Sequence, residues 1–210
     1  MKNSLTLLTL LVILNGCITN TSNESRKHST IYDDNSYDTL AIYLGNQAVN
    51  NYKSINSNNY EQLLRTSLVL IDSLLRIDDS YPTGYYYKIR ILSKLNLNDS
   101  ALNICKEASI KYPNNPYVYF AKGIVQERMK DYEASIISFK KSYFLFQNSS
   151  LFSIQFDFEA KEFAYFFCYG RKRSLFRVDS IINNNKDVFY DKKFAKRIKQ
   201  LNRELFIEKW

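Results

Sequence analysis

Residues 119–147, YFAKGIVQERMKDYEASIISFKKSYFLFQ, contain two amphipathic stretches joined by a short polar turn at Lys130 and Asp131. The second stretch places small or apolar residues at the spacing i, i+4 and i+7, and the same spacing occurs in two earlier stretches, at a constant interval of about 34 residues. The three sets are Ser67, Ile71 and Leu74; Ala101, Cys105 and Ala108; and Ser135, Phe139 and Ser142. Residues at this spacing share one face of a helix, and the small ones allow a neighbouring helix to approach closely. The pattern therefore predicts α-helical hairpins repeated at this interval.

A helix-turn-helix unit of this length resembles the tetratricopeptide repeat (TPR). Tyr119 occupies the place of the motif's tryptophan, Gly123 keeps its glycine, and residues 130–133 resemble its Gly-Asp-Tyr turn. The preceding unit departs from the motif at Ile89, where glycine is expected. The resemblance covers residues 37–147 and implies an all-α fold, an α-α superhelix of tetratricopeptide-like helical hairpins over 37–210, with clearest repeats at 82–115 and 116–149. An arbitrary helical bundle with recurrent apolar spacing is the alternative.

The composition favours a helical protein and argues against most catalytic chemistry. The chain has 5 Gly and 3 Pro in 210 residues, fewer turn formers than a many-stranded β protein needs. A single histidine, His28, and the lack of a CxxC motif argue against Ser-His-Asp sites, Cys-His sites and His-rich metal sites. Three carboxylates on one aromatic-rich stretch, Asp157, Glu159 and Glu162, are interpreted as charged helix surface. We therefore predict no enzyme activity, no cofactor and no metal.

The N-terminus resembles a bacterial lipoprotein signal. Lys2 precedes a mainly apolar run at residues 5–14, which is shorter than the about 20 residues of a membrane-spanning helix. The run ends in Leu14-Asn15-Gly16-Cys17, which is similar to a lipobox. This resemblance implies a signal peptide at 1–16, lipidation of Cys17 by several acyl chains that anchor the protein stably, and a flexible tether over 17–36. An ordinary signal peptide is the alternative. We expect a lipid-anchored cell-envelope protein, and Ile18 after the cysteine favours the outer membrane.

The C-terminal third is aromatic and then basic. Residues 151–169 carry aromatic side chains on more than one helix face, which predicts burial on both sides. Gly170 is expected to end that helix, residues 171–183 to form a shorter one, and 187–208 to form a capping helix. One face of the capping helix carries Tyr190, Phe194, Ile198, Leu201 and Leu205. Residues 171–210 hold twelve Lys and Arg against five Asp and Glu. This excess suits lipid headgroups, an acidic partner or a solvated face, and nucleic acid is not expected for an exported protein.

The TPR resemblance also implies a concave groove, lined by the first helix of each repeat, that binds a peptide or a partner helix. The groove positions carry over to Thr83, Tyr86, Arg90, Lys94, Tyr117, Phe120, Ile124, Glu127 and Arg128. Aromatic side chains beside arginine are typical of binding hot spots, and this set suits a segment with apolar and some acidic side chains. We therefore expect a membrane-anchored scaffold for protein-protein interaction at the periplasmic or outer-membrane surface. A solute- or glycan-binding cell-envelope lipoprotein is the alternative.

Two cysteines, Cys105 and Cys168, lie in apolar helical stretches of the expected mature domain. Export to an oxidising compartment makes a disulfide between them conceivable. A free buried cysteine behaves as a small hydrophobic residue, and core packing is the role we expect.

Overall fold

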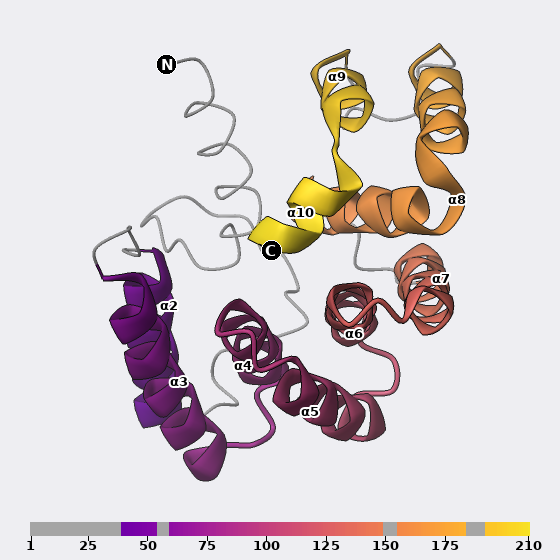
Figure 1. Ribbon diagram of the computed structural model, residues 1–210. Coiled ribbons are helices and arrows are strands. Elements are labelled where there is room, and N and C mark those ends of the chain that lie inside the picture. Colours follow the sequence, from indigo (N-terminus) through magenta and orange to yellow (C-terminus); the bar gives the residue numbers. More distant parts are fainter. Residues whose placement is uncertain (1–38, 54–58, 149–154, 184–191) are drawn as a thin grey trace, which may run out of the picture. The chain divides into compact units, whose positions relative to one another are not determined.

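The computed structural model describes residues 39–53, 59–148, 155–183 and 192–210 (Figure 1). The expected signal peptide, the lipidation at Cys17 and the tether lie outside the described residues. Every regular element in the described ranges is a helix, so the all-α prediction is confirmed. None of these helices combines the length and the hydropathy that crossing a membrane requires. The chain divides into two compact units, Met1–Ser80 and Tyr81–Trp210, which are described separately.

In the first unit, α2 (Thr39–Lys53) and α3 (Tyr60–Ile77) pack against each other as a hairpin. The buried face of α3 carries Leu64, Ser67, Ile71 and Leu74, the last three of which form the earliest set of the repeated pattern. The hydroxyl of Ser67 donates a hydrogen bond of 3.1 Å to the backbone carbonyl oxygen of Ala48. Ser67 therefore satisfies its polar atom while allowing the two helix backbones to lie close together.

The second unit begins with two hairpins, α4 (Pro82–Lys94) with α5 (Asn98–Lys111) and α6 (Pro116–Arg128) with α7 (Tyr132–Asn148). The starts of equivalent helices are separated by the predicted interval, from Pro82 to Pro116 and from Asn98 to Tyr132. The turns also agree, because Asn96 (φ 59°) and Lys130 (φ 63°) both adopt the left-handed conformation that commonly ends a helix. The amides that follow them, of Leu97 and Asp131, each donate a 2.9 Å hydrogen bond to equivalent carbonyl oxygens, of Leu92 and Gln126. The predicted repeat of helical hairpins is therefore confirmed.

The predicted small-residue positions lie in the interior of both hairpins. Ala101, Cys105 and Ala108 are buried in α5, and Ser135, Phe139 and Ser142 are buried in α7. At Gly123 the backbone of α6 lies close to α7, because a Cβ atom there would be only 2.8 Å from the ring of Phe139. The hairpin α6–α7 thus combines a glycine with a bulky ring, whereas the equivalent positions in α4–α5 hold isoleucine and cysteine.

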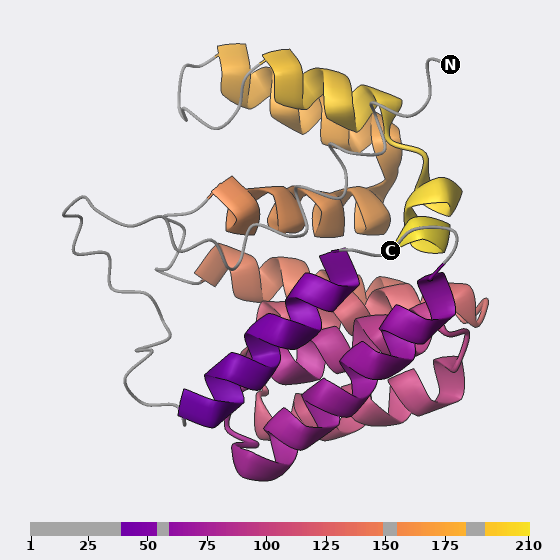
Figure 2. The same cartoon turned by 90° about the vertical axis from the view of Figure 1, so that its left-hand side faces the viewer.

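The rest of the second unit consists of α8 (Gln155–Asn183), α9 (Lys192–Gln200) and α10 (Arg203–Lys209). Helix α8 is two helical segments that meet at Gly170 (φ 79°), so the predicted helix end is confirmed. In its first segment Phe163, Phe166 and Phe167 are buried, as expected, whereas Tyr165 and Tyr169 are half-buried. Figure 2 shows α9 beside the second segment of α8, in agreement with Figure 1.

The single capping helix expected over 187–208 is wrong in its described part, because the helix breaks after α9. Asn202 caps a new helix, its side-chain oxygen accepting a 2.9 Å hydrogen bond from the amide of Leu205. Asparagine is a preferred residue at this position. The break also changes which side chains are buried: Phe194, Ile198 and Leu201 are buried as expected, but Leu205 is 44% exposed.

Candidate partner-binding surface

All nine residues of the expected groove lie on α4 and α6, two helices in contact with each other. Four pairs among them occupy equivalent positions of the two repeats: Thr83 and Tyr117, Tyr86 and Phe120, Arg90 and Ile124, and Lys94 and Arg128. We call the surface formed by these nine residues the inner face. In Figure 1, α4 and α6 lie nearer to α10 than α5 and α7 do.

The nine residues differ in accessibility. Four of them remain partly exposed, namely Thr83, Lys94, Tyr117 and Arg128. The others, Tyr86, Arg90, Phe120, Ile124 and Glu127, are buried. In this structure the central part of the inner face is therefore in contact with the chain's own C-terminal segment, and its two ends are accessible.

Both α4 and α6 begin with proline, and α6 also has a capping side chain. Each helix has proline at its first position, where the missing amide proton costs no helical hydrogen bond. Asn115 caps α6, its side-chain oxygen accepting a 2.9 Å hydrogen bond from the amide of Tyr117. Tyr117 then packs edge to face against Tyr86, with ring centroids 5.9 Å apart, and so joins the two helices.

The centre of the inner face is an aromatic cluster around Phe120. Its ring lies 5.7 Å from that of Phe139 on α7, 6.3 Å from Phe167 on α8 and 6.4 Å from Phe206 on α10. Phe206 is also 5.2 Å from Phe167 and 5.3 Å from Phe163. Aromatic pairs of this kind contribute about 0.5–1.5 kcal/mol each beyond their buried area. Helix α10 is thus anchored through one phenylalanine that contacts residues of α6 and α8.

Trp210 contacts α4 through Tyr86 and Arg90. The indole lies edge to face with Tyr86 at 6.0 Å, and the guanidinium carbon of Arg90 is 5.3 Å from the indole centroid. One guanidinium nitrogen of Arg90 also donates a 3.4 Å hydrogen bond to the backbone oxygen of Trp210. Both side chains are 1% exposed, so the cation-π contact is largely desolvated, a setting in which it contributes about 2 kcal/mol.

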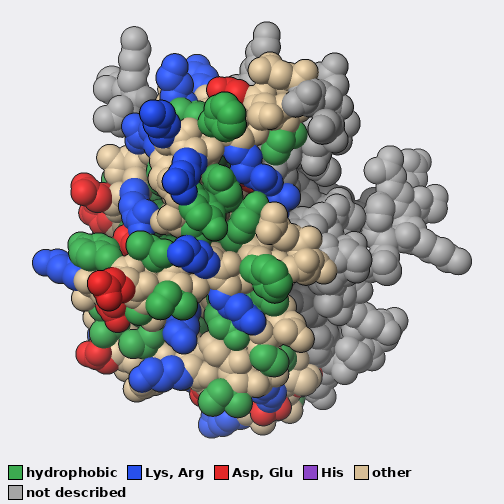
Figure 3. All heavy atoms as spheres, turned by 90° about the vertical axis from the view of Figure 1, so that its right-hand side faces the viewer, with side chains coloured by type: hydrophobic (Ala, Val, Ile, Leu, Met, Phe, Trp, Pro, Cys, Tyr) green, Lys and Arg blue, Asp and Glu red, His purple; other side chains and the backbone are tan. Residues whose placement is uncertain are grey.

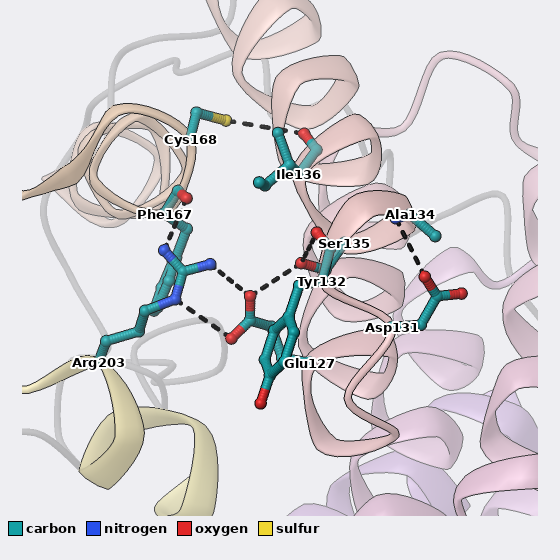
Figure 4. Close-up of polar contacts among 9 residues, drawn as sticks. All are labelled: Glu127, Asp131, Tyr132, Ala134, Ser135, Ile136, Phe167, Cys168 and Arg203. Carbon is teal, nitrogen blue, oxygen red and sulfur yellow. Dashed lines mark hydrogen bonds and ion pairs between the residues drawn. The ribbon is translucent and has the colours of Figure 1, made fainter.

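An ion pair between α6 and α10 completes the contact (Figure 4). The guanidinium of Arg203 donates to both carboxylate oxygens of Glu127, one of them through Nε at 3.1 Å. The hydroxyl of Ser135 donates to the same carboxylate at 2.8 Å, and Arg203 Nη1 donates to the backbone oxygen of Phe167 at 2.8 Å. Glu127 is 8% exposed. A carboxylate so buried requires such partners, and Arg203 meets that requirement in the bidentate geometry that favours arginine over lysine.

One accessible end of the inner face is strongly cationic. It carries Lys94 and Arg128 at equivalent positions in the final turns of α4 and α6, and the buried Arg90 lies one turn before Lys94. Burial, followed by the nearby charges of Arg90 and Arg128, lowers the pKa of Lys94 to about 7. Arg128 also donates a 3.2 Å hydrogen bond to the side-chain oxygen of Asn96. A carboxylate placed here would reduce the mutual repulsion of these groups.

Sequence reasoning missed the C-terminal residues that cover the inner face, namely Arg203, Phe206 and Trp210. Residues 192–208 keep a helical apolar period across the break, so periodicity alone does not reveal α10. The available signal was Asn202, whose residue type is favoured where a helix begins.

The described residues contain no group of His, Cys, Asp and Glu that could hold a metal ion. The interpretation of three carboxylates as charged helix surface is wrong for Glu159 and Glu162, which are buried and paired with Arg197 and Arg177 respectively. The side chain of Asp157 is outside the described set. Cys105 and Cys168 are free thiols, and burial raises the pKa of each to about 12. These groups are placed for packing and ion pairing.

The outer surface of the second unit also exposes large hydrophobic residues, among them Ile110, Ile137 and Phe176. Figure 3 shows hydrophobic side chains on one face interspersed with Lys and Arg. The aromatic rings of the inner face, by contrast, contact one another and those of the C-terminal segment. The inner face is therefore the better candidate for a defined binding surface.

Comparison with known proteins gives limited similarity. No family model and no curated protein matches the chain. Among solved structures, a TPR domain of Arabidopsis OM64 is similar over 60% of this chain and 94% of that chain, with a TM-score of 0.47 and 13% identity. The assignment of sequentially packed helical hairpins rests on the equivalences between repeats inside this chain.

Proposed function

We propose that the protein is a membrane-anchored interaction scaffold whose inner face binds a segment of a partner protein. The observation that carries this proposal is the register of α4 and α6, which present equivalent aromatic and cationic residues side by side. Repeated helices that align such residues form extended binding surfaces in helical-repeat proteins. Tyr and Arg are also the residue types that dominate binding energy at interfaces.

The anchoring part of the proposal rests on the lipobox-like Leu14-Asn15-Gly16-Cys17. Acyl chains on Cys17 would hold the scaffold at the cell envelope, with the outer membrane favoured by Ile18. A surface-bound protein needs only moderate affinity for a partner in the same membrane, because anchoring raises the effective concentration of the two.

Site-specific photocrosslinking in intact cells tests the proposal. A photoreactive amino acid at Thr83 or Lys94, both partly exposed, is expected to give a discrete crosslinked protein. The matched control is Ile110 on α5, which is 83% exposed but outside the inner face. Equal crosslinking from all three positions, or from Ile110 alone, would contradict binding at the inner face.

A further inference from the structure

Helix α10 and the residue that follows it contact the inner face through three side chains at the helical spacing i, i+3 and i+7. Arg203 pairs with Glu127, Phe206 packs on Phe120, and Trp210 packs on Tyr86 and Arg90. Four of the nine inner-face residues are therefore in contact with this short segment. The contacts describe the chemistry that the inner face recognises: one basic group and two aromatic rings on one side of a helix.

Several features of α10 indicate that it is an imperfect occupant. It has seven residues, far fewer than the about 12–15 that an isolated helix needs in water, so its helical state depends on the surface beneath it. Its other side is solvated, with Glu204, Leu205 and Glu208 exposed. The indole nitrogen of Trp210 is buried and has no hydrogen-bond partner among the described residues. An unmet buried donor weakens binding relative to an occupant that supplies an acceptor.

From these contacts we infer that the inner face binds an amphipathic helix of a partner protein in place of α10. The partner helix carries a basic residue followed three and seven positions later by aromatic residues. Glu127 receives the basic group, and Tyr86, Arg90 and Phe120 receive the rings, while α10 occupies the same surface until it is displaced. This inference rests on the proposed function and specifies its partner and its regulation.

The requirement for a basic residue follows from the burial of Glu127. Removing Arg203 without replacement deprives Glu127, which is 8% exposed in this structure, of its main counterion, and this is strongly unfavourable. A partner helix with arginine at the equivalent position restores both hydrogen bonds, whereas one with glutamate adds a second negative charge. Charge at this single position should therefore decide which helices displace α10.

A peptide probe tests the exchange in the full chain, kept in detergent micelles. The probe is a labelled peptide with the sequence of residues 201–210 in which Trp210→Phe has been made, so that Trp210 of the protein is the only tryptophan present. We expect a saturable rise in peptide anisotropy together with a red shift of the tryptophan emission as Trp210 leaves its buried position. The same peptide with Arg203→Glu should bind at least tenfold more weakly.

A protein variant separates exchange from ordinary packing. Arg203→Ala in the protein weakens the contact of α10 and leaves Glu127 without its counterion. The affinity for the 201–210 peptide that keeps Arg203 should therefore rise tenfold or more. Arg203→Lys, which keeps the charge without the bidentate geometry, should give an intermediate rise. Arg65→Ala, which removes an exposed ion pair in α3, is the control and should leave peptide affinity unchanged. Circular dichroism checks that each variant remains folded.

Absence of binding to the wild-type chain and to both Arg203 variants would overturn the inference and make α10 a permanent part of the core. Equal binding of the Arg203→Glu peptide would overturn it as well. Photocrosslinking at Thr83 and Lys94 tests the proposed function without using the peptide. A crosslinked partner that neither peptide displaces would leave the proposed function standing while removing this inference.

Discussion

The close approach of α6 and α7 at Gly123 gives a prediction with a definite sign. A Cβ atom at position 123 would lie 2.8–2.9 Å from three ring atoms of Phe139. The ring cannot move aside readily, because it is fully buried, stacked on Phe167 at 4.7 Å and packed edge to face with Phe120 at 5.7 Å. We therefore expect Gly123→Ala to force a shift of well-packed atoms.

Two opposing terms set the size of the effect. Overpacking a core costs about 1–3 kcal/mol, whereas replacing glycine inside a helix gains about 0.5–1 kcal/mol. Gly123→Ala should therefore lower the free energy of unfolding by up to about 2.5 kcal/mol. In a Phe139→Ala background, which itself costs about 3–5 kcal/mol, the ring is gone and only the helix term remains. There the same substitution should stabilise the protein by about 0.5–1 kcal/mol.

Urea unfolding followed by far-ultraviolet circular dichroism measures the four free energies of this double-mutant cycle. The expected coupling between the two sites is about 1–3 kcal/mol. Gly170→Ala is a matched control: it is strained by the positive φ of 79°, but a Cβ there meets nothing within 4 Å, so it should show no coupling to Phe139. If Gly123→Ala stabilised both backgrounds equally, the packing argument would be refuted.

Three further predictions concern ionisation and processing. Because the pKa of Lys94 is lowered to about 7 in the folded chain from 10.5, the unfolded chain binds more protons between those values. Relative to Lys94→Met, the wild-type free energy of unfolding should thus rise from pH 7 to pH 9.5. If the difference between the urea midpoints of the two proteins were the same at both pH values, this prediction would be wrong. Cys105 is fully buried with a pKa of about 12, so maleimide should modify it only as the protein opens, and rapid labelling of the native chain would contradict its placement. Cys17→Ala should leave an unprocessed precursor without fatty acid in radiolabelled cells, and normal maturation would exclude a lipobox.

The repeat hairpins could be predicted because their determinants are local. The spacing of Ala101, Cys105 and Ala108 and its recurrence in α7 reflect helix geometry and close packing of adjacent helices, both of which are visible within a single repeat. The turns at Asn96 and Lys130 share one backbone conformation despite different residue types. Local pattern therefore specified the order and spacing of these helices.

The placement of α10 could not be predicted because it depends on contacts 76 to 120 residues apart in sequence. The apolar period of residues 192–208 fits one continuous helix. The chain instead breaks after Gln200, and Phe206 packs against aromatic rings of α6 and α8. The candidate site was therefore only half recognised: its residues on α4 and α6 were named, but not the segment that contacts them. Arg203 lies outside the apolar face of the expected capping helix, yet it pairs with a buried glutamate.

The basic excess of the C-terminal region has a structural explanation that the net charge alone does not reveal. Three of its arginines, Arg177, Arg197 and Arg203, each form an ion pair with a glutamate that is at most 8% exposed, on α8 or α6. Such pairs add little net stability compared with apolar packing, but breaking one costs about 3–5 kcal/mol because the remaining charge stays buried. We therefore expect these pairs to select position, because a segment lacking arginine at the correct place would leave a glutamate buried without its counterion.

The same asymmetry accounts for how the inner face could discriminate among helices. Phe206 and Trp210 supply apolar contacts that many aromatic sequences would match, so these residues alone give affinity with little selectivity. Glu127 supplies the selectivity, because a competing helix without a basic group leaves its carboxylate buried and deprived of Arg203. A competing helix with arginine exchanges one bidentate pair for another at little cost. In the proposed exchange, replacement of one buried ion pair by another is what lets α10 cap the inner face and still give way to a matching partner.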